Sequence, residues 1–207
     1  MENFVITIGR LCGSGGTFVG QALQKKLGIE LYDKNLLRLA AEDSGISEEL
    51  FANADEKLKS SLLFKISRQV YKGELIPPES DNFVSNRNLF NYQAKVLKEL
   101  AERESFVVIG RCADFVLRDR PGLVRVFVCA EHEDCVACEE KRLSITRKAA
   151  EQRIAKMNKY RSEYYRYYTG QVWNDPLHYD LCLNTSTMTY EQAADLIVER
   201  LKQMGRI

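Results

Sequence analysis

The loop Gly13-Ser14-Gly15-Gly16-Thr17 is the first group of residues whose types and spacing could carry chemistry. It follows an uncharged, β-branched run and precedes a helical pattern. In that setting glycines let the backbone turn its N–H groups inward, and a helix N-terminus favours an anion. Thr17 stands where the Ser/Thr of a P-loop meets a magnesium ion. The sequence predicts a phosphate-binding loop made of Gly13, Ser14, Gly15, Gly16 and Thr17, with Thr17 as the metal ligand.

The loop departs at two positions from the P-loop pattern G-x-x-x-x-G-K-[ST]: Arg10 replaces the first glycine and Gly16 replaces the lysine. That lysine normally brings positive charge to the transferring phosphoryl group. We expect Arg10 to supply this charge, although a surface arginine paired with an acidic neighbour is an equally good reading. A dinucleotide-binding loop is the other alternative, and Asp33 lies at a tolerable distance for it, but the glycine spacing is wrong.

Short apolar runs alternate with helical periods along the chain. The predicted strands are 4–8, 29–32, 106–110, 123–128 and 179–184. The predicted helices are 17–27, 33 to about 45, 89–103, 112–117, 132–142, 146–168 and one capped by Thr189, with another opening at Ser47 and an unreadable polar stretch at 53–84. This alternation predicts an α/β fold with a five-stranded parallel sheet flanked by helices. Ligands of such sheets bind at the carboxyl ends of the strands.

Length and composition exclude several classes of protein. The 207 residues predict one domain, and 45% hydrophobic residues are enough for a core. Lys and Arg (30) nearly cancel Asp and Glu (29), which argues against a nucleic-acid-coating protein. The N-terminal residues do not resemble a signal peptide, and no apolar run is long enough to span a membrane. We therefore expect a cytoplasmic protein without nucleic-acid or membrane partners.

Six cysteines include one close group, Cys129, Cys135 and Cys138, with His132 nearby. A disulfide framework is not expected in a cytoplasmic chain of this length. A zinc site usually requires a second Cys or His pair. We expect free thiols on a helix face, with a crowded zinc site as the alternative.

Several blocks, taken in order, resemble one known family. They are Val5 to Arg10 with the glycine loop, Tyr32-Asp33-Lys34, Val108 to Ala113, Arg161 to Gly170 and Tyr179 to Ser186. Together they are similar to the cytidylate-kinase-like proteins, a branch of the nucleoside monophosphate kinases of the P-loop type. Members of that branch commonly carry a glycine where other kinases have the loop lysine. The resemblance implies a core of residues 1–32, 105–145 and 175–207, an acceptor-binding segment at 33–104 and a lid at 146–174.

The resemblance also implies roles for individual residues. Arg111 would bind the phosphate of the acceptor, and Asp33 and Arg38 would belong to the acceptor site, with metal binding or helix capping as further readings of Asp33. Lid arginines Arg153 and Arg161 would act with Arg10 in catalysis, closing over the phosphates and expelling water. For any single lid residue, a solvated basic helix face is the alternative. The clustered tyrosines at 160, 164, 165, 167 and 168 either pack the lid or stack on a base.

Two features depart from the family pattern. Cys135 and Cys138 stand where the family usually has arginines, and Asn158 stands where an aspartate is common. The resulting hypothesis is an ATP- and Mg²⁺-dependent phosphotransferase acting on a small acceptor, for example the nucleoside monophosphate CMP. A nucleotide-binding sensor that kept the fold and lost the chemistry is the alternative, and an oxidoreductase fits poorly. The expected partners are nucleotides, and the chain would allow a homodimer without requiring one.

Overall fold

The computed structural model describes residues 3–33, 35–44, 46–47, 49–50, 73–75 and 85–207. A five-stranded sheet forms the centre, in the order β2-β3-β1-β4-β5, and every neighbouring pair is parallel. Its strands are β1 (Val5–Arg10), β2 (Glu30–Tyr32), β3 (Phe106–Ile109), β4 (Leu123–Cys129) and β5 (Leu181–Asn184). The predicted five-stranded parallel sheet is confirmed.

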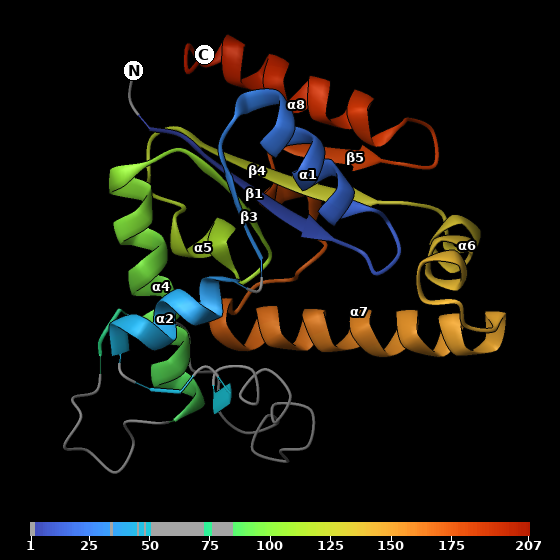
Figure 1. Ribbon diagram of the computed structural model, residues 1–207, viewed down its shortest axis with the longest axis horizontal. Helices are drawn as coiled ribbons and strands as arrows, with labels where there is room; N and C mark the ends of the chain where they lie inside the picture. Colours follow the sequence, from blue (N-terminus) through green and yellow to red (C-terminus); the bar gives the residue numbers. More distant parts are fainter. Residues whose placement is uncertain (1–2, 34, 45, 48, 51–72, 76–84) are drawn as a thin grey trace.

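Helices cover both faces of the sheet (Figure 1). One face carries α1 (Gly16–Leu27) and α8 (Tyr190–Gln203). The other face carries α2 (Asn35–Ser44), α4 (Asn86–Arg103) and α5 (Ala113–Val116), and α7 (Arg147–Thr169) runs along its outer side. At one end of the molecule α6 (His132–Leu143) joins β4 to α7, and the short helix η2 (Pro176–His178) leads into β5.

Strand alternation divides the core into two layers. In β1, Ile6 and Ile8 are fully buried with α1 and α8, while Val5 packs with the layer of α2, α4 and α5. Successive side chains of a strand point to opposite faces, so an uncharged run such as β1 must be covered on both sides. This sandwich fixes the carboxyl end of β1, from which the glycine loop leaves.

Helix ends follow local capping chemistry. Gly28, at φ 65°, ends α1, and Thr189 caps the start of α8 as predicted, in a capping box that Gln192 completes. The predicted helix 89–103 begins earlier, at Asn86, because the Ser85 side chain accepts a hydrogen bond from the Asn88 N–H. Thr146 caps α7 in the same way through the Ala149 N–H.

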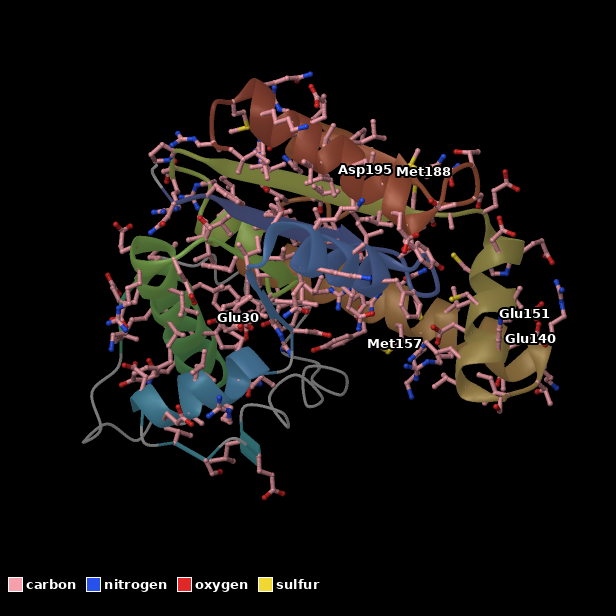
Figure 2. All side chains as sticks on the ribbon, turned by 45° about the horizontal axis from the view of Figure 1, so that its top comes forward. Glu30, Glu140, Glu151, Met157, Met188 and Asp195 are labelled. Carbon is pink, nitrogen blue, oxygen red and sulfur yellow. The ribbon has the colours of Figure 1, made fainter. Side chains whose placement is uncertain are left out.

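Ion pairs join neighbouring helices at two places. Lys26 of α1 contacts Asp195 of α8 at 2.8 Å. At the α6–α7 end, Arg147 of α7 contacts Glu133 of α6 at 2.8 Å, and it also contacts Glu151 (labelled in Figure 2), one turn further along α7, at 3.0 Å. Exposed pairs contribute little to stability individually; the Arg147–Glu133 pair connects the start of α7 with α6.

Part of the predicted acceptor segment lies outside the described residues, namely 51–72 and 76–84, together with Lys34 and most of the helix expected from Ser47. The division into core, acceptor segment and lid therefore stays a prediction. Among the helices that the structure describes, none is long and apolar enough to cross a membrane.

Candidate functional site

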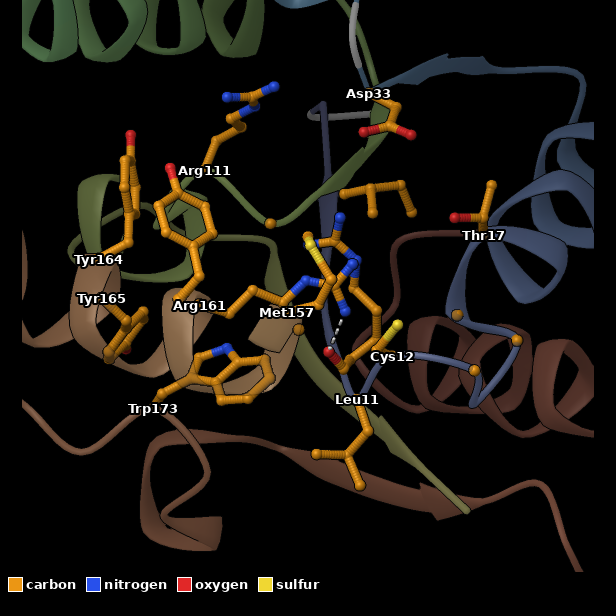
Figure 3. A pocket seen from close by; sticks show the side chains of 18 of the residues that line it. Leu11, Cys12, Thr17, Asp33, Arg111, Met157, Arg161, Tyr164, Tyr165 and Trp173 are labelled. Carbon is orange, nitrogen blue, oxygen red and sulfur yellow. Dashed lines mark hydrogen bonds between the residues drawn. The ribbon is translucent and has the colours of Figure 1, made fainter. Parts of the chain in front are cut away.

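A cavity of about 530 Å³ opens at the carboxyl ends of β1, β2 and β3 (Figure 3). The glycine loop and the start of α1 form one wall, and α6 and α7 form another. Its charged lining residues are Arg10, Asp33, Arg111, Asp114, Glu139, Arg142, Arg153 and Arg161. Five arginines against three carboxylates make this a cavity suited to anions.

Close packing and backbone conformation require glycine at two positions of the loop. Gly13 has φ 85°, and a Cβ there would lie 2.4 Å from the Cys135 carbonyl oxygen. Gly15 has φ 77°, and a Cβ there would lie 2.2 Å from the ring of Tyr190. Both positions therefore exclude a side chain through backbone conformation and lack of space.

Four of the five predicted loop residues, Gly13, Gly15, Gly16 and Thr17, line the cavity. The fifth, Ser14, is 1% exposed, and its hydroxyl is directed to the backbone carbonyls of Leu11 (3.0 Å) and Val128 (2.9 Å). The Ser14 side chain thus anchors the loop to β4 and does not line the cavity.

Arg10 occupies the space that a lysine at position 16 would need. A Cβ on Gly16 would lie 2.6 Å from the Arg10 Cβ, and a Cβ on Gly110 would lie 2.2 Å from the Arg10 Nη1. The Arg10 side chain therefore runs over Gly16 and ends beside Gly110, the residue that directly follows β3. Within the described residues its guanidinium has no hydrogen bond or salt bridge to another side chain.

Burial, reinforced by the nearby Arg161, lowers the pKa of Arg10 to about 9, and Asp33 only partly offsets this effect. The group is still charged at neutral pH. A buried cation of this kind is stabilised by any anion that enters the cavity.

The middle of α7 is docked directly on the loop. The Arg161 Nη1 donates to the Arg10 carbonyl oxygen at 3.0 Å, drawn as a dashed line in Figure 3. The Asn158 Oδ1 accepts a hydrogen bond from the Cys12 N–H at 2.8 Å. Burial lowers the pKa of Arg161. Asn158 is a position where the sequence departs from the family that it resembles, and the structure gives it a contact with the loop backbone.

A buried carboxylate organises two arginines at the other end of the cavity. The side chain of Glu139 is 3% exposed and contacts Arg142 Nη2 and Arg153 Nε, each at 2.8 Å. Burial alone would raise the pKa of Glu139, but the hydrogen bonds from the two arginines outweigh it and lower this pKa. Both arginines line the cavity.

Sequence reasoning missed Glu139 and Arg142. Arg142 lies one helical turn beyond Cys138 on α6 and lines the cavity. It therefore supplies a cation on the helix where the resemblance leads us to expect arginines at positions 135 and 138. The spacing of Glu139 and Arg142, three residues apart on a predicted helix, was the available signal.

The predicted acceptor residues divide into two groups. Arg111 and Asp33 line the cavity, and Figure 3 shows them at the same end of it. Arg111 and Cys112 are non-glycine residues with φ of 60° and 52°, a conformation that costs free energy and is frequent at functional sites. Arg38 does not line the cavity: it is exposed and pairs with Glu42 on α2 at 2.6 Å. The structure therefore gives no support to Arg38 as an acceptor residue.

Aromatic side chains form the end of the cavity near the C-terminus of α7. Trp173 is 7% exposed, and Tyr164, Tyr165 and Trp173 gather on one side in Figure 3. Tyr165 donates a 2.5 Å hydrogen bond to the Asp114 carboxylate. Burial raises the pKa of Asp114, and the Tyr165 hydroxyl opposes that effect. Neither Asp114 nor Trp173 was predicted from the sequence.

All six cysteines are thiols in the structure, and three of them are fully buried, Cys12, Cys112 and Cys135. Burial raises the pKa of the Cys135 thiol to about 11. Among the described residues, no group of three or more His, Cys, Asp or Glu side chains is arranged to hold a metal ion. The choice between free thiols and a zinc site stays a prediction.

Residues 5–187 match the cytidylate kinase-like family. The chain belongs to the cytidylate kinase-like family. Its glycine loop without a lysine, its Gly110-Arg111 pair and its arginine-bearing α7 are thus features of a family member. No curated protein matches the chain.

Solved structures share the fold of this cytidylate kinase-like chain. An uncharacterized protein from Eubacterium ventriosum has a TM-score of 0.71 at 24% identity, covering 97% of this chain and 99% of that one. The shikimate kinase of Bacteroides thetaiotaomicron (0.52, 15% identity) covers 99% of both chains. The APS kinase of Mycobacterium tuberculosis, solved with AMPPNP and APS (0.51, 17%), covers 97% and 98%. At these identities the likeness establishes the fold, which is that of P-loop kinases.

Proposed function

We propose that this chain transfers a phosphoryl group from ATP–Mg²⁺ to a nucleoside monophosphate such as CMP. The observation that carries the proposal is the path of Arg10. Its side chain crosses the glycine that replaces the loop lysine and brings a buried positive charge to the cavity. Phosphoryl transfer depends mainly on positioning and on stabilising charge, so a cation at this point serves the purpose of the missing lysine.

The other side chains would divide the remaining work. Arg161 lies beside Arg10 and would stabilise charge on the transferring group, while Arg142 and Arg153 would contact the donor phosphates. Arg111, at the end of the cavity near β3, would hold the acceptor phosphate. A phosphate acceptor requires no strong general base, so no poised histidine is needed.

Magnesium fits the side chains present. The Thr17 hydroxyl and the Asp33 carboxylate line the same cavity, and oxygen ligands of this kind suit Mg²⁺, which usually also binds substrate phosphates. When bound, the ion would neutralise part of the phosphate charge. The expected cytoplasmic location and the homodimer stay predictions.

A paired substitution tests the central claim. Arg10→Ala should lower kcat by roughly 100- to 1000-fold, the loss typical of one essential charge-stabilising donor. Gly16→Lys alone should also be inactive, because its Cβ would lie 2.6 Å from the Arg10 Cβ. The double variant Arg10→Gly/Gly16→Lys should recover a large part of the activity, because it restores the usual loop.

The matched control is Arg38→Ala, which removes an exposed arginine outside the cavity and should leave kcat unchanged. Activity would be followed by coupled ATP consumption over the four nucleoside monophosphates. Full activity in Arg10→Ala would overturn the role of Arg10. If no monophosphate is phosphorylated while ATP still raises the melting temperature, the chain is a nucleotide-binding sensor.

A further inference from the structure

The five clustered tyrosines of α7 have different surroundings. Tyr168 is buried, stacks on Phe90 of α4 with centroids 3.9 Å apart, and donates to the Asn86 carbonyl oxygen at 3.1 Å. Tyr165 is buried and donates to Asp114. Tyr167 packs edge-on against Tyr168, outside the residues that line the cavity. These three rings hold the helix in place.

Tyr160 and Tyr164 are different, because both are half-buried and both line the cavity. They stand four residues apart on one face of α7, with ring centroids 5.9 Å apart and planes tilted by 52°. Tyr164 is backed by Tyr168 at 4.8 Å and by Phe90 at 6.2 Å. This backing limits the movement of the Tyr164 ring.

This aromatic surface lies at the acceptor end of the cavity. Figure 3 shows Tyr164 on the same side as Arg111, with Thr17 of the phosphate loop on the opposite side. Arg153, which is paired with Glu139 of α6, belongs to the first half of α7, about three turns before Tyr164. A ring resting on Tyr164 would therefore belong to the molecule whose phosphate meets Arg111.

We propose that Tyr160 and Tyr164 form a stacking surface for the flat heteroaromatic ring of the acceptor, while Arg111 holds the acceptor phosphate. This inference rests on the proposed function and specifies its substrate class. Every nucleobase has a π-face, so stacking admits nucleotides generally and discriminates against phosphorylated sugars that lack a ring system. Selection among the bases then depends on other contacts.

Calorimetric titration of the whole chain tests the surface without requiring turnover. The ligands are CMP, UMP, AMP and GMP, each compared with ribose 5-phosphate, which keeps the sugar and phosphate and lacks the base. At least one monophosphate should bind tenfold or more tightly than ribose 5-phosphate, as expected for one stacked base. Tyr164→Leu and Tyr160→Leu should each remove most of that difference while leaving ribose 5-phosphate affinity unchanged.

Tyr164→Phe and Tyr160→Phe keep the ring and should bind like the unmodified chain. Tyr167→Leu is the matched control, since it removes a ring of the same helix outside the cavity. Circular dichroism and the melting temperature distinguish loss of folding from loss of stacking. If Tyr164→Leu unfolds, Tyr160→Leu alone tests the stacking surface.

Equal binding of ribose 5-phosphate and all four monophosphates overturns the inference, as does an equal loss for both ligand types in the leucine variants. Absence of binding by every monophosphate overturns it too. Tight, tyrosine-dependent binding of a monophosphate that is never phosphorylated supports the stacking surface and refutes the proposed phosphotransfer, so the two failures are distinguishable.

Discussion

The two halves of α7 line one cavity with opposite chemistry. Its first half presents Arg153, fixed by the buried Glu139, and its second half presents the rings of Tyr164 and Tyr165. Between them, Asn158 and Arg161 bind the backbone of the loop. One helix thus combines a charged end, an aromatic end, and a central attachment to the loop.

The two ends of α7 also orient their side chains by different means. Arginines on long flexible stems need a carboxylate to orient them, and a buried carboxylate with two hydrogen-bonded partners does this at a cost in desolvation. Aromatic rings have few rotatable bonds and are oriented by packing alone. At one end of α7, Glu139 of α6 therefore orients Arg153, and at the other end Phe90 of α4 packs against Tyr164.

Breaking the central attachment should have the largest effect. Arg161→Ala removes both a cavity cation and the hydrogen bond to the Arg10 carbonyl, so kcat should fall by about 100-fold or more. Steady-state kinetics with the best monophosphate checks this. Lys156→Ala, at an exposed position of the same helix, is the control, and a comparable loss there would mean that general charge rather than attachment is responsible.

The aromatic half is tested next through its buried hydrogen bond. Tyr165→Phe leaves the buried Asp114 carboxyl without its 2.5 Å donor, which should lower the free energy of unfolding by about 1–3 kcal/mol. Urea denaturation measures the change. Tyr168→Phe, which loses a neutral bond to the Asn86 carbonyl, should cost less, and the reverse order would contradict a special role for Asp114.

The charged half is tested by Glu139→Ala. Without the carboxylate, Arg142 and Arg153 lose their common partner, and the KM for ATP should rise about tenfold, roughly 1.4 kcal/mol. The KM for the acceptor should change much less, because Tyr164 and Arg111 lie at the other end. Equal changes in both KM values would show that the two halves are not independent.

The smallest effect concerns pH. The folded pKa of Glu139 lies below its usual value, so its carboxylate stabilises the fold above the unfolded pKa, near 4.3, and that stabilisation is lost as the pH falls. The stability gap between the unmodified chain and Glu139→Gln should therefore be widest near neutral pH and shrink below about pH 4.3. Thermal melts across that range measure it, and a gap independent of pH would refute the ionic origin.

Much of this arrangement could be predicted from local sequence. The uncharged β-branched runs gave the strands, and the glycine loop and Gly110-Arg111 were placed at strand ends, where parallel sheets bind ligands. The expectation that Arg10 lies near the loop follows from its position in the chain, and the structure brings its side chain over Gly16.

The remaining features depend on contacts between distant segments. Glu139 meets Arg153 only because α6 packs on α7, and Trp173 enters the cavity from the connection that leads to β5. Tyr164 lines the cavity and Tyr167 does not. This difference depends on the rotation of α7 about its axis, which the sequence pattern does not specify. The acceptor role of Arg38 stays a prediction; its i,i+4 pairing with Glu42 on α2 is a contact that helical spacing alone could have indicated.

The contact between Gly16 and the Arg10 stem also has an evolutionary consequence. The two positions cannot change independently: a lysine at 16 collides with the existing arginine, and loss of the arginine alone removes the charge. Any exchange between this loop and the lysine-bearing type must pass through a defective intermediate or occur as a simultaneous double change. If the proposed role of Arg10 holds, the two positions would show strong epistasis with a steric cause, and a lineage that had adopted this loop would tend to keep it.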